Sequence, residues 1–495
     1  MSIALLHSRA TLGIRAIPVR VEIHLGPGLP GFTMVGLPDT AVRESKDRVR
    51  SALINGGFRI PQQRITVNLA PADLPKDGGR FDLPIAVGIL LASGQLGRVD
   101  LTGMEWIGEL ALSGALSPVP AILPGALAAA HAGHTLVVPA GNGDEAALAG
   151  ADTLAVNSLT ELCAHLKGDA RLALHTAPPP PEDAGNAPCL SQIRGQPAAK
   201  RVLEIAAAGG HSLLMGGPPG AGKSMLASRL PGLLPALNRA QALEVAAIHS
   251  LRNARPAPTF LQPPYRAPHH TASAPALVGG GGRPRPGEIS LAHQGVLFLD
   301  ELPEFQPRVL EVLREPLETG EVHIARAAQQ VSFPARFQLV AAMNPCPCGY
   351  LGDPEKGCGY ECEKAKRYQR RLSGPLLDRI DLHLEVPAVS PDTLLGNADG
   401  EPSRVVRERV LAARERQMHR QGCLNRELDA DRLMASLGPH KPWLTGVMER
   451  LELSARALHR SLRVARTIAD LAHSEAVGRE HLREALSYRQ NLLRS

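Results

Sequence analysis

The stretch HSLLMGGPPGAGKS, residues 211–224, decides the fold. A short apolar run leads into a glycine-rich turn, and the helix-favouring MLASRL follows. Residues 217–224 have the spacing G-x-x-x-x-G-K-S of a phosphate-binding loop, in which backbone N–H groups turn inward around phosphate oxygens. The Lys223 ammonium then reaches the terminal phosphates, and the Ser224 hydroxyl ligates Mg²⁺. We therefore expect an α/β fold that binds ATP and Mg²⁺.

Two further apolar runs end in polar residues and complete this expected site. GVLFLDE, residues 295–301, places Asp300 and Glu301 at the end of a strand, where the ligands of parallel sheets lie. Asp300 is expected to hold Mg²⁺ through water, and Glu301 to polarise the water that attacks ATP. FQLVAAMN, residues 337–344, ends on Asn344, which is expected to orient the same water. The predicted nucleotide-binding residues are Gly217, Pro218, Pro219, Gly220, Ala221, Gly222, Lys223, Ser224 and Asp300.

The length of 495 residues exceeds that of one ordinary core and favours two to four domains. The proline run TAPPPPEDAGNAP at 176–188 is typical of a stiff linker, which we assign to 171–188. Before it, strand-like runs alternate with helical ones, which indicates a mixed α/β domain over 1–170. After it we expect a nucleotide-binding core over 189–388 and a helical segment over 389–495.

Composition favours a cytoplasmic protein without a membrane span. The longest mostly apolar stretch, 83–94, is too short to cross a bilayer, and no signal segment is evident. The net charge is +6, and residues 401–495 carry the whole surplus, with 18 Lys and Arg against 12 Asp and Glu. Such a surplus is typical either of solvated helix faces or of contact with nucleic acid.

Four of the seven cysteines fall in NPCPCGYLGDPEKGCGYEC, residues 344–362. A disulfide is disfavoured in a reducing compartment. Two close pairs, Cys346 with Cys348 and Cys358 with Cys362, are typical of a tetrahedral thiolate site for a structural Zn²⁺, although their spacing differs from the common one. Thiols without a metal and a redox switch are the alternatives.

Several longer segments carry more information than the phosphate loop alone. They read GQPAAKRVLEIAAAGGHSLLMGGPPGAGKS, RAPHHTASAPALVGGGGRPRPGEISLAHQGVLFLDELPEF, AAMNPCPCG, SGPLLDRIDLHLEVP and SARALHRSLRVARTIADL. All of them resemble P-loop ATPases of the AAA+ class related to the ATPase subunit of magnesium chelatase. They resemble the bacterial YifB/ComM family more closely, and the resemblance covers essentially the whole chain.

This resemblance implies a homo-hexameric ring with ATP at the subunit interfaces. The LLDRID match makes Arg379 the expected arginine finger of a neighbouring site, because a guanidinium spreads transition-state charge. Arg456 in SARALHR matches the sensor arginine of a C-terminal helical lid. Residues 267–282 belong to an insert in the family's second helix, and the two adjacent histidines there are poorly placed to share a metal ion. Residues 321–335 are typical of a hairpin, which in related helicases tracks DNA.

The first domain resembles the proteolytic domain of Lon, an α+β fold of the ribosomal protein S5 domain 2 type. PKDGGRFDLPIAVGIL at 75–90 and GELALSGALSPVPAILPGALAAAHAG at 108–133 carry this resemblance. The serine and lysine of the Lon pattern are replaced by Arg80 and Leu123, and neither residue serves as a nucleophile or its base. The fold is therefore expected without peptide hydrolysis, as a docking or substrate-guiding module.

The leading hypothesis is an ATP-driven DNA motor, a helicase that promotes branch migration in homologous recombination or natural transformation. Its expected partners are single-stranded or branched DNA and recombination proteins. The alternative is ATP-dependent insertion of Mg²⁺ into a porphyrin, against which the Lon-like domain argues. A non-enzymatic scaffold is disfavoured because Lys223, Asp300, Glu301 and Asn344 are all intact.

Overall fold

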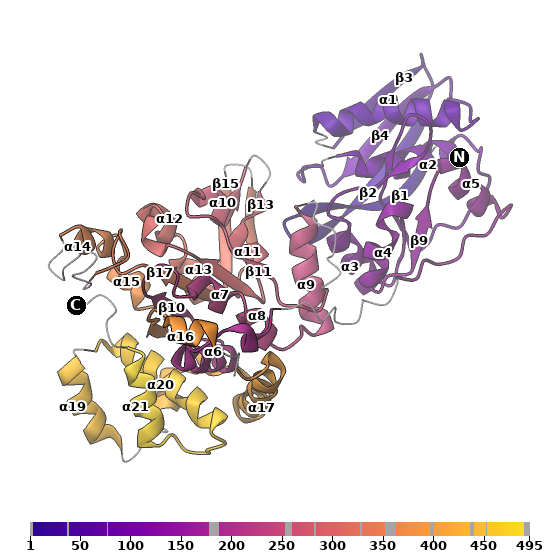
Figure 1. The fold of residues 1–495 in the computed structure, drawn as a ribbon. Helices are drawn as coiled ribbons and strands as arrows, with labels where there is room; N and C mark the ends of the chain where they lie inside the picture. Colours follow the sequence, from indigo (N-terminus) through magenta and orange to yellow (C-terminus); the bar gives the residue numbers. More distant parts are fainter. Residues whose placement is uncertain are drawn as a thin grey trace. The chain divides into compact units, whose positions relative to one another are not determined.

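The protein divides into two compact units, seen here in a computed structural model (Figure 1). One unit comprises Met1–Pro181 with Arg239–Phe260, and the other Glu182–Asn238 with Leu261–Ser495. The residues described are 3–36, 39–76, 78–177, 188–252, 260–281, 284–326, 329–351, 363–396, 400–435, 440–451 and 453–489.

The N-terminal unit is built on a seven-stranded mixed sheet with the order β3-β4-β2-β1-β5-β8-β9. β1 and β2 form a long antiparallel hairpin, whereas β1, β5, β8 and β9 run parallel. Because side chains alternate across a strand, β1 buries Leu6 and Ala10 and exposes Ile3 and Leu5. The strands of this sheet are β1 (Ile3–Leu12), β2 (Arg15–Gly26), β3 (Gly31–Val35), β4 (Arg64–Ala70), β5 (Met104–Trp106), β8 (Thr135–Pro139) and β9 (Thr153–Val156). β6 (Glu109–Leu110) and β7 (Leu116–Ser117) form a separate antiparallel pair.

Helices complete the core of this unit, and one of them comes from far along the chain. The apolar stretch 83–94 forms most of α2, which is buried over nearly its whole length. Leu123 of α3 is buried and packs with Ala246 and Ala247 of α9. The helices are α1 (Thr40–Asn55), α2 (Asp82–Ala92), α3 (Ile122–Ala132), α4 (Gly143–Leu148), α5 (Leu159–Lys167) and α9 (Arg239–Ser250).

The second unit is built on a five-stranded sheet with the order β11-β14-β17-β10-β18, in which every neighbouring pair is parallel. β10, β14 and β17 are buried throughout, as their continuous apolar runs predict for a sheet covered on both faces. The strands are β10 (Leu213–Gly216), β11 (Tyr265–Arg266), β14 (Val296–Leu299), β17 (Gln338–Met343) and β18 (Leu382–Glu385). Two small antiparallel ribbons accompany the sheet, β12 (Gly279–Gly280) with β13 (Arg285–Pro286) and β15 (Glu321–Arg326) with β16 (Gln329–Pro334).

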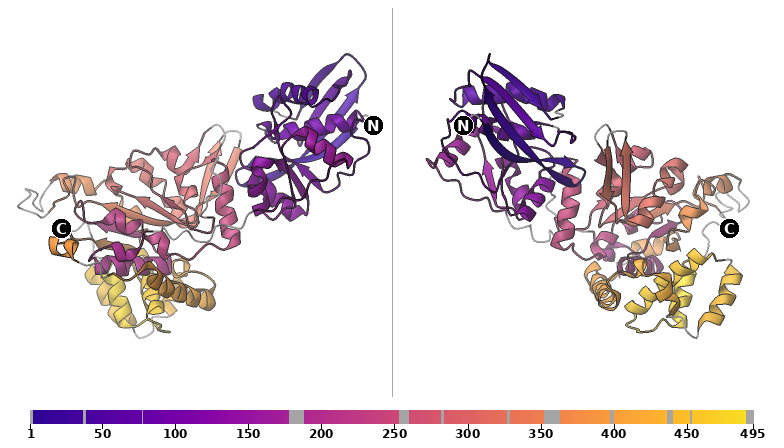
Figure 2. Two further views of the ribbon diagram at one scale, coloured as in Figure 1. Left: turned by 45° about the vertical axis from the view of Figure 1, so that its right-hand side comes forward. Right: turned by 180° about the vertical axis from the view of Figure 1, so that it is seen from behind.

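The C-terminal helices pack on the nucleotide-binding core and share its apolar cluster (Figure 2). In both views they lie below the sheet, and the β15–β16 hairpin lies at the upper side. The core helices are α6 (Pro197–Gly209), α7 (Lys223–Ala227), α8 (Leu230–Leu233), α10 (Ala274–Val278), α11 (Glu288–Leu291), α12 (Pro307–Glu311), α13 (Arg314–Thr319), α14 (Glu363–Gln369), α15 (Gly374–Leu377) and α16 (Pro391–Leu395). The C-terminal helices are α17 (Ser403–Gln421), α18 (Ala430–Ala435), α19 (Lys441–Leu451), α20 (Ala455–Leu471) and α21 (Arg479–Ser487).

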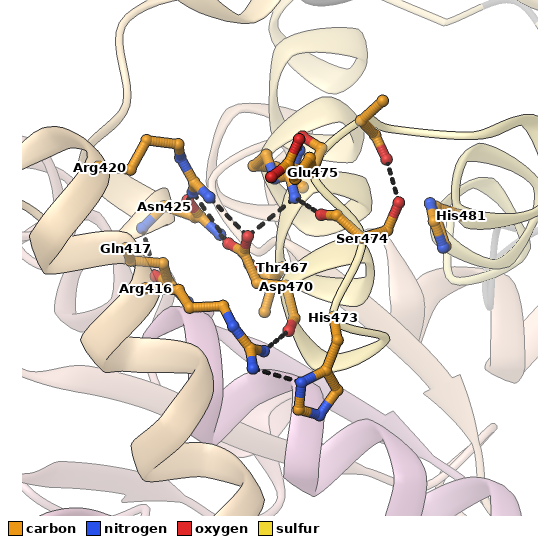
Figure 3. Close-up of polar contacts among 12 residues, drawn as sticks. Arg416, Gln417, Arg420, Asn425, Thr467, Asp470, His473, Ser474, Glu475 and His481 are labelled. Carbon is orange, nitrogen blue, oxygen red and sulfur yellow. Dashed lines mark hydrogen bonds and ion pairs between the residues drawn. The ribbon is translucent and has the colours of Figure 1, made fainter.

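A buried carboxylate, Asp470 near the end of α20, ties these helices together (Figure 3). Arg420 of α17 donates to both of its oxygens at 2.6 and 2.9 Å, and Arg466 donates at 2.9 Å. Asn425 also donates to Asp470, at 2.8 Å, and to the Thr467 hydroxyl, at 3.1 Å. The network therefore joins α17, the turn after it and α20.

Among the residues that the structure describes, no helix is both long and apolar enough to cross a membrane.

Candidate nucleotide-binding site

The phosphate loop follows β10 and leads directly into α7. Gly220 and Gly222 have φ of +79° and +87°, in the left-handed region that side chains disfavour, and a Cβ at either position would meet nothing within 4 Å. Gly217 has the opposite reason for being glycine, since a Cβ there would lie 2.1 Å from the carbonyl oxygen of Val386. The loop is thus fixed at one end by close packing and open where phosphates would enter.

Lys223 is 7% exposed and lies inside the curve of this loop. Its ammonium donates to the carbonyl oxygens of Gly217 and Pro218, at 2.6 and 2.8 Å, and to Oδ1 of Asn344 at 3.0 Å. Burial lowers the pKa of Lys223, and the charges of Asp300 and Glu301 oppose that shift. The two residues predicted from separate strands, Lys223 and Asn344, are therefore in contact.

The predicted cation ligands are also brought together. The Ser224 hydroxyl donates to Oδ2 of Asp300 at 2.6 Å, across 76 residues of sequence. Asp300 follows β14, and its other oxygen accepts from the backbone N–H of Glu301 at 2.9 Å. This arrangement follows from the sheet order, because β17 lies between β10 and β14 and all three strands end at the same edge.

These residues suit a nucleoside triphosphate with a divalent cation. The loop offers backbone donors around an open cradle, one buried ammonium faces it, and a hydroxyl and a carboxylate oxygen lie side by side as Mg²⁺ prefers.

Arg379 and Arg456 lie at the other edge of the same sheet. Arg379 precedes β18, whereas the phosphate loop follows the parallel neighbour β10. Its guanidinium donates to the Pro375 carbonyl and pairs with Oε1 of Glu318, both at 2.7 Å. Arg456 of α20 lies 3.5 Å from the same Glu318 oxygen. The structure therefore brings the two predicted arginines together, but away from the phosphate loop and Lys223.

The surroundings of these arginines form an open cavity of about 700 Å³ with a basic lining. Asp381 in its wall accepts from Arg460 at 2.6 Å. Burial alone would raise the pKa of Asp381, but the nearby His211, whose Nδ1 lies 3.7 Å from Oδ2, and the charge of Arg460 hold it well below its usual range. The basic residues that line the cavity are Arg336, Arg379, Arg426, Arg456, His459, Arg460 and Arg463.

The cysteine segment lies directly against the phosphate loop. Cys346 is buried, and its Sγ lies 3.0 Å from that of Cys348. A Cβ at Gly349 would lie 2.4 Å from Cδ of Pro219 in the loop. Cys358 and Cys362 lie outside the described residues, within which no group of three or more His, Cys, Asp or Glu is arranged for a metal ion. The Zn²⁺ site stays a prediction.

Three residues that contact the phosphate loop or a predicted site residue were themselves not predicted from the sequence. Glu318 pairs with both Arg379 and Arg456, and Gln196 donates to the Pro387 carbonyl at 2.7 Å beside the phosphate loop. Nδ1 of His270 lies 3.0 Å from Oε2 of Glu301. No motif marks Glu318, whose partners are distant in sequence. Gln196 lies in the family-like segment that begins GQPAAKRV, but no role was predicted for it. His270 had a signal, the adjacent pair of histidines, but we considered that pair only as metal ligands.

Comparisons with known proteins bear on the whole chain. Residues 189–394 match the family model for magnesium chelatase, subunit ChlI, and residues 400–489 match the model for its C-terminal part. Residues 21–142 match the model for subunit ChlI of Mg-chelatase.

Full-length relatives are much more similar than the chelatase subunits. The chain is 51% identical to the uncharacterized protein YifB of Escherichia coli strain K12 over 498 residues, 99% of this chain and 97% of that protein. It is 49% identical to the competence protein ComM of Haemophilus influenzae over 500 residues, 99% and 98% of the two chains. The magnesium-chelatase 38 kDa subunit of Cereibacter sphaeroides is 26% identical over 350 residues, 61% of this chain and 91% of the subunit.

Proposed function

Since the chain belongs to the YifB/ComM family of magnesium-chelatase-like AAA+ proteins, we propose that it is an ATP-driven ring motor that acts on DNA. Its proposed task is branch migration, as a helicase in homologous recombination or natural transformation. The name of the ComM relative, competence protein, supports a link with natural transformation.

In the proposed hydrolysis, residues that follow β10, β14 and β17 at one edge of the sheet bind ATP and activate the attacking water. The phosphate loop and Lys223 bind the β- and γ-phosphates of the substrate ATP, and Ser224 and Asp300 hold Mg²⁺. A cation held by these residues would neutralise negative charge that develops on the phosphates. Glu301 polarises the attacking water, and Asn344, already in contact with Lys223, orients it.

The position of Arg379 and Arg456 is the observation that carries the ring proposal. Both side chains pair with Glu318 at the sheet edge opposite the phosphate loop, so they are not placed to stabilise charge on the nucleotide of their own chain. A guanidinium that completes a phosphoryl-transfer site is commonly supplied by a neighbouring subunit. We infer that a second copy of this chain presents its phosphate loop to these arginines, in a hexamer by analogy with the family.

Two ribbons of the second unit support contact with DNA. The β15–β16 hairpin forms over the residues expected from the sequence, and Arg326 at the end of β15 is in register with Gln329 of β16. The β12–β13 ribbon packs on it, since a Cβ at Gly279 would lie 3.1 Å from Cδ1 of Ile324. We propose that these ribbons form the part of each subunit that moves along the DNA strand.

The basic surplus of residues 401–495 supports DNA contact less than its count suggests. Arg409 pairs with Glu204 at 2.5 Å, Arg420 with Asp470 at 2.6 Å, and Arg460 with Asp381 at 2.6 Å. Charges used in this way inside the unit offer little to a phosphate backbone.

The test measures ATP hydrolysis by the purified protein without DNA, with single-stranded DNA and with forked DNA, beside displacement of one strand from a three-stranded junction. We expect DNA to raise the turnover number and the fork to be unwound. The Lys223→Ala variant is expected to lose about 100-fold or more in turnover, because the charge on the transferred phosphate loses its buried cation. Hydrolysis that ignores DNA, together with no strand displacement, would contradict the DNA motor and favour the chelatase-type alternative.

A further inference from the structure

Glu318 joins the two arginines at the sheet edge opposite the phosphate loop. Its Oε1 lies 2.7 Å from Nη2 of Arg379 and 3.5 Å from Nη2 of Arg456. The three residues come from separate parts of the chain: the last turn of α13, the turn before β18 and the first turn of α20. One carboxylate oxygen therefore contacts two guanidinium groups that the fold, and not the local sequence, brings together.

Arg379 depends on Glu318 for the direction of its guanidinium. Its side chain is 7% exposed; Nη1 donates to the Pro375 carbonyl at 2.7 Å, and Nη2 pairs with Glu318. Among the residues that the structure describes, no acceptor meets the buried Nε of Arg379. A buried donor without an acceptor is costly, so the contacts of Nη1 and Nη2 must outweigh that cost. The contact with a charged acceptor is the stronger of the two.

A second ion pair fixes the backbone segments from which the two arginines extend. Asp381, two residues after Arg379, accepts from Arg460 at 2.6 Å. Arg460 lies about one turn after Arg456 on α20. This pair sets the spacing of the two segments, but it leaves the ends of two long, flexible side chains undetermined. Glu318 is the residue that contacts both ends.

Glu318 itself extends from a well-anchored helix end. α13 ends at Thr319 and is closed by Gly320, whose φ is +73°. The N–H of Gly320 donates to the Pro316 carbonyl at 2.9 Å, and its carbonyl accepts from the N–H of Ala335 at 2.7 Å. Because Ala335 follows β16, these bonds attach α13 to the base of the β15–β16 hairpin. The half-exposed carboxylate thus reaches the cavity from a fixed point.

The charges of this group suit the binding of an anion. Two guanidinium groups share one carboxylate, so one positive charge remains uncompensated, and Arg336 and Arg463 add to it in the lining of the same cavity. Without the carboxylate the two guanidinium groups would repel each other and separate. With it, a terminal phosphate brought by a neighbouring copy would meet both arginines at once.

We propose that Glu318 is a positioning residue that keeps Arg379 and Arg456 side by side for the ATP of the next subunit. It acts only through the two arginines and touches neither the substrate nor the reacting atoms. This inference rests on the proposed function, since it assumes an ATP site shared between two copies of the chain.

The experiment compares three variants of the full-length protein with the wild type. Glu318→Ala removes the carboxylate, and Glu318→Gln keeps an acceptor oxygen in a side chain of the same size. Glu315→Ala is the matched control on the same helix, because Glu315 is 59% exposed and lies 3.9 Å from His323, away from the arginines. For each protein, kcat and KM for ATP are measured, together with binding of a fluorescent ATP analogue.

Glu318→Ala is expected to lose roughly tenfold in kcat, because misplaced groups stabilise a transition state poorly. Its affinity for the analogue should stay within about twofold, since the phosphate loop lies at the other edge of the sheet. Glu318→Gln should retain about a third of the wild-type kcat, because a neutral acceptor forms a weaker hydrogen bond with a guanidinium. Glu315→Ala should resemble the wild type.

Mixed rings then show which half of a shared site Glu318 serves. An equal mixture of Glu318→Ala with Lys223→Ala should exceed the mean activity of its two components about fivefold, because intact arginines then meet intact phosphate loops at a quarter of the interfaces. Glu318→Gln should gain about twofold in the same mixture. A mixture of Glu318→Ala with Arg379→Ala should show no gain, since both variants lack the same half.

A wild-type kcat in Glu318→Ala would overturn the positioning role, as would an equal loss in Glu315→Ala. A gain with Arg379→Ala in place of Lys223→Ala would place Glu318 in the site of its own chain and also overturn the proposal. Loss of analogue binding in both Glu318 variants would mark a purely structural role, with the same consequence.

The mixture of Lys223→Ala with Arg379→Ala separates this proposal from the shared site on which it rests. If that mixture recovers activity and the mixture of Glu318→Ala with Lys223→Ala does not, the role of Glu318 is wrong and the shared site stands. If neither mixture recovers activity, the shared site is wrong, and the role of Glu318 fails with it.

Discussion

Asp470 shows how one residue can govern the C-terminal helices. It is fully buried, and its carboxylate accepts from Arg420 and Asn425 (Figure 3). The same carboxylate also accepts from Arg466. Arg466 is itself buried, and its burial lowers its pKa while Asp470 opposes that shift. A buried charge network of this kind is costly to break from one side, because the remaining charges stay in a poorly solvated place.

The Asp470→Asn variant is therefore expected to lose about 3 kcal/mol in free energy of unfolding. Urea denaturation followed by far-ultraviolet circular dichroism measures this loss. Glu408→Gln is the matched control, since the Arg404–Glu408 pair of α17 is exposed and such pairs contribute little. Equal midpoints for Asp470→Asn and the wild type would show that the network does not hold the helices.

At this scale, a short motif was enough to predict which side chains the fold brings together. Lys223 and Ser224 follow from the spacing of the phosphate loop, and Asp300 follows from its place after an apolar strand. Glu318 has no such pattern, and the histidine pair that marks His270 does not indicate its partner. Each residue meets its partner through strand order, which the sequence does not state locally.

At the scale of elements, the cysteine segment packs against the phosphate loop. It begins two residues after Asn344, and Gly349 packs on Pro219 so closely that a side chain has no room. Cys346 and Cys348 lie side by side at this contact. A metal bound there would stiffen the wall of the nucleotide site.

We predict about one Zn²⁺ per chain in protein purified without chelator, measured by elemental analysis. The Cys346→Ser variant should lose the metal and bind ATP less tightly, because the loop against Pro219 is no longer braced. Cys423→Ser, which changes a cysteine outside the segment, is the control. A metal-free wild type with normal ATP binding would exclude the zinc site and leave uncomplexed thiols.

Element prediction succeeded for strongly patterned segments. RITVNLA became β4 at the expected residues, and the buried runs before Asp300 and Asn344 became parallel strands. The helix α9 was not predicted to pack in the N-terminal unit. The spacing of its apolar residues is compatible with packing in either unit. Only the tertiary contact of Ala246 and Ala247 with Leu123 places the helix in the N-terminal unit.

At the scale of the whole molecule, the chain passes between the two units more often than a single linker implies. The chain passes to the N-terminal unit a second time over Arg239–Phe260 and returns to the second unit at Leu261. Leu123, at the position where the Lon pattern has its lysine, is buried against this returning helix. Arg80, at the serine position, is buried and donates to the Pro120 carbonyl at 2.9 Å. Both side chains therefore have packing roles.

The central claim is that each ATP site is shared between two copies of the chain. Lys223 lies at one edge of the sheet and Arg379 at the other, so each variant that lacks one of them should still supply the other half. The most direct test mixes Lys223→Ala with Arg379→Ala protein and measures ATP hydrolysis. Each variant alone should be nearly inactive, whereas an equal mixture should recover about a quarter of wild-type activity, the fraction of interfaces with both halves intact in a randomly mixed ring. A mixture as inactive as its components, or an Arg379→Ala protein with full activity, would contradict the shared site.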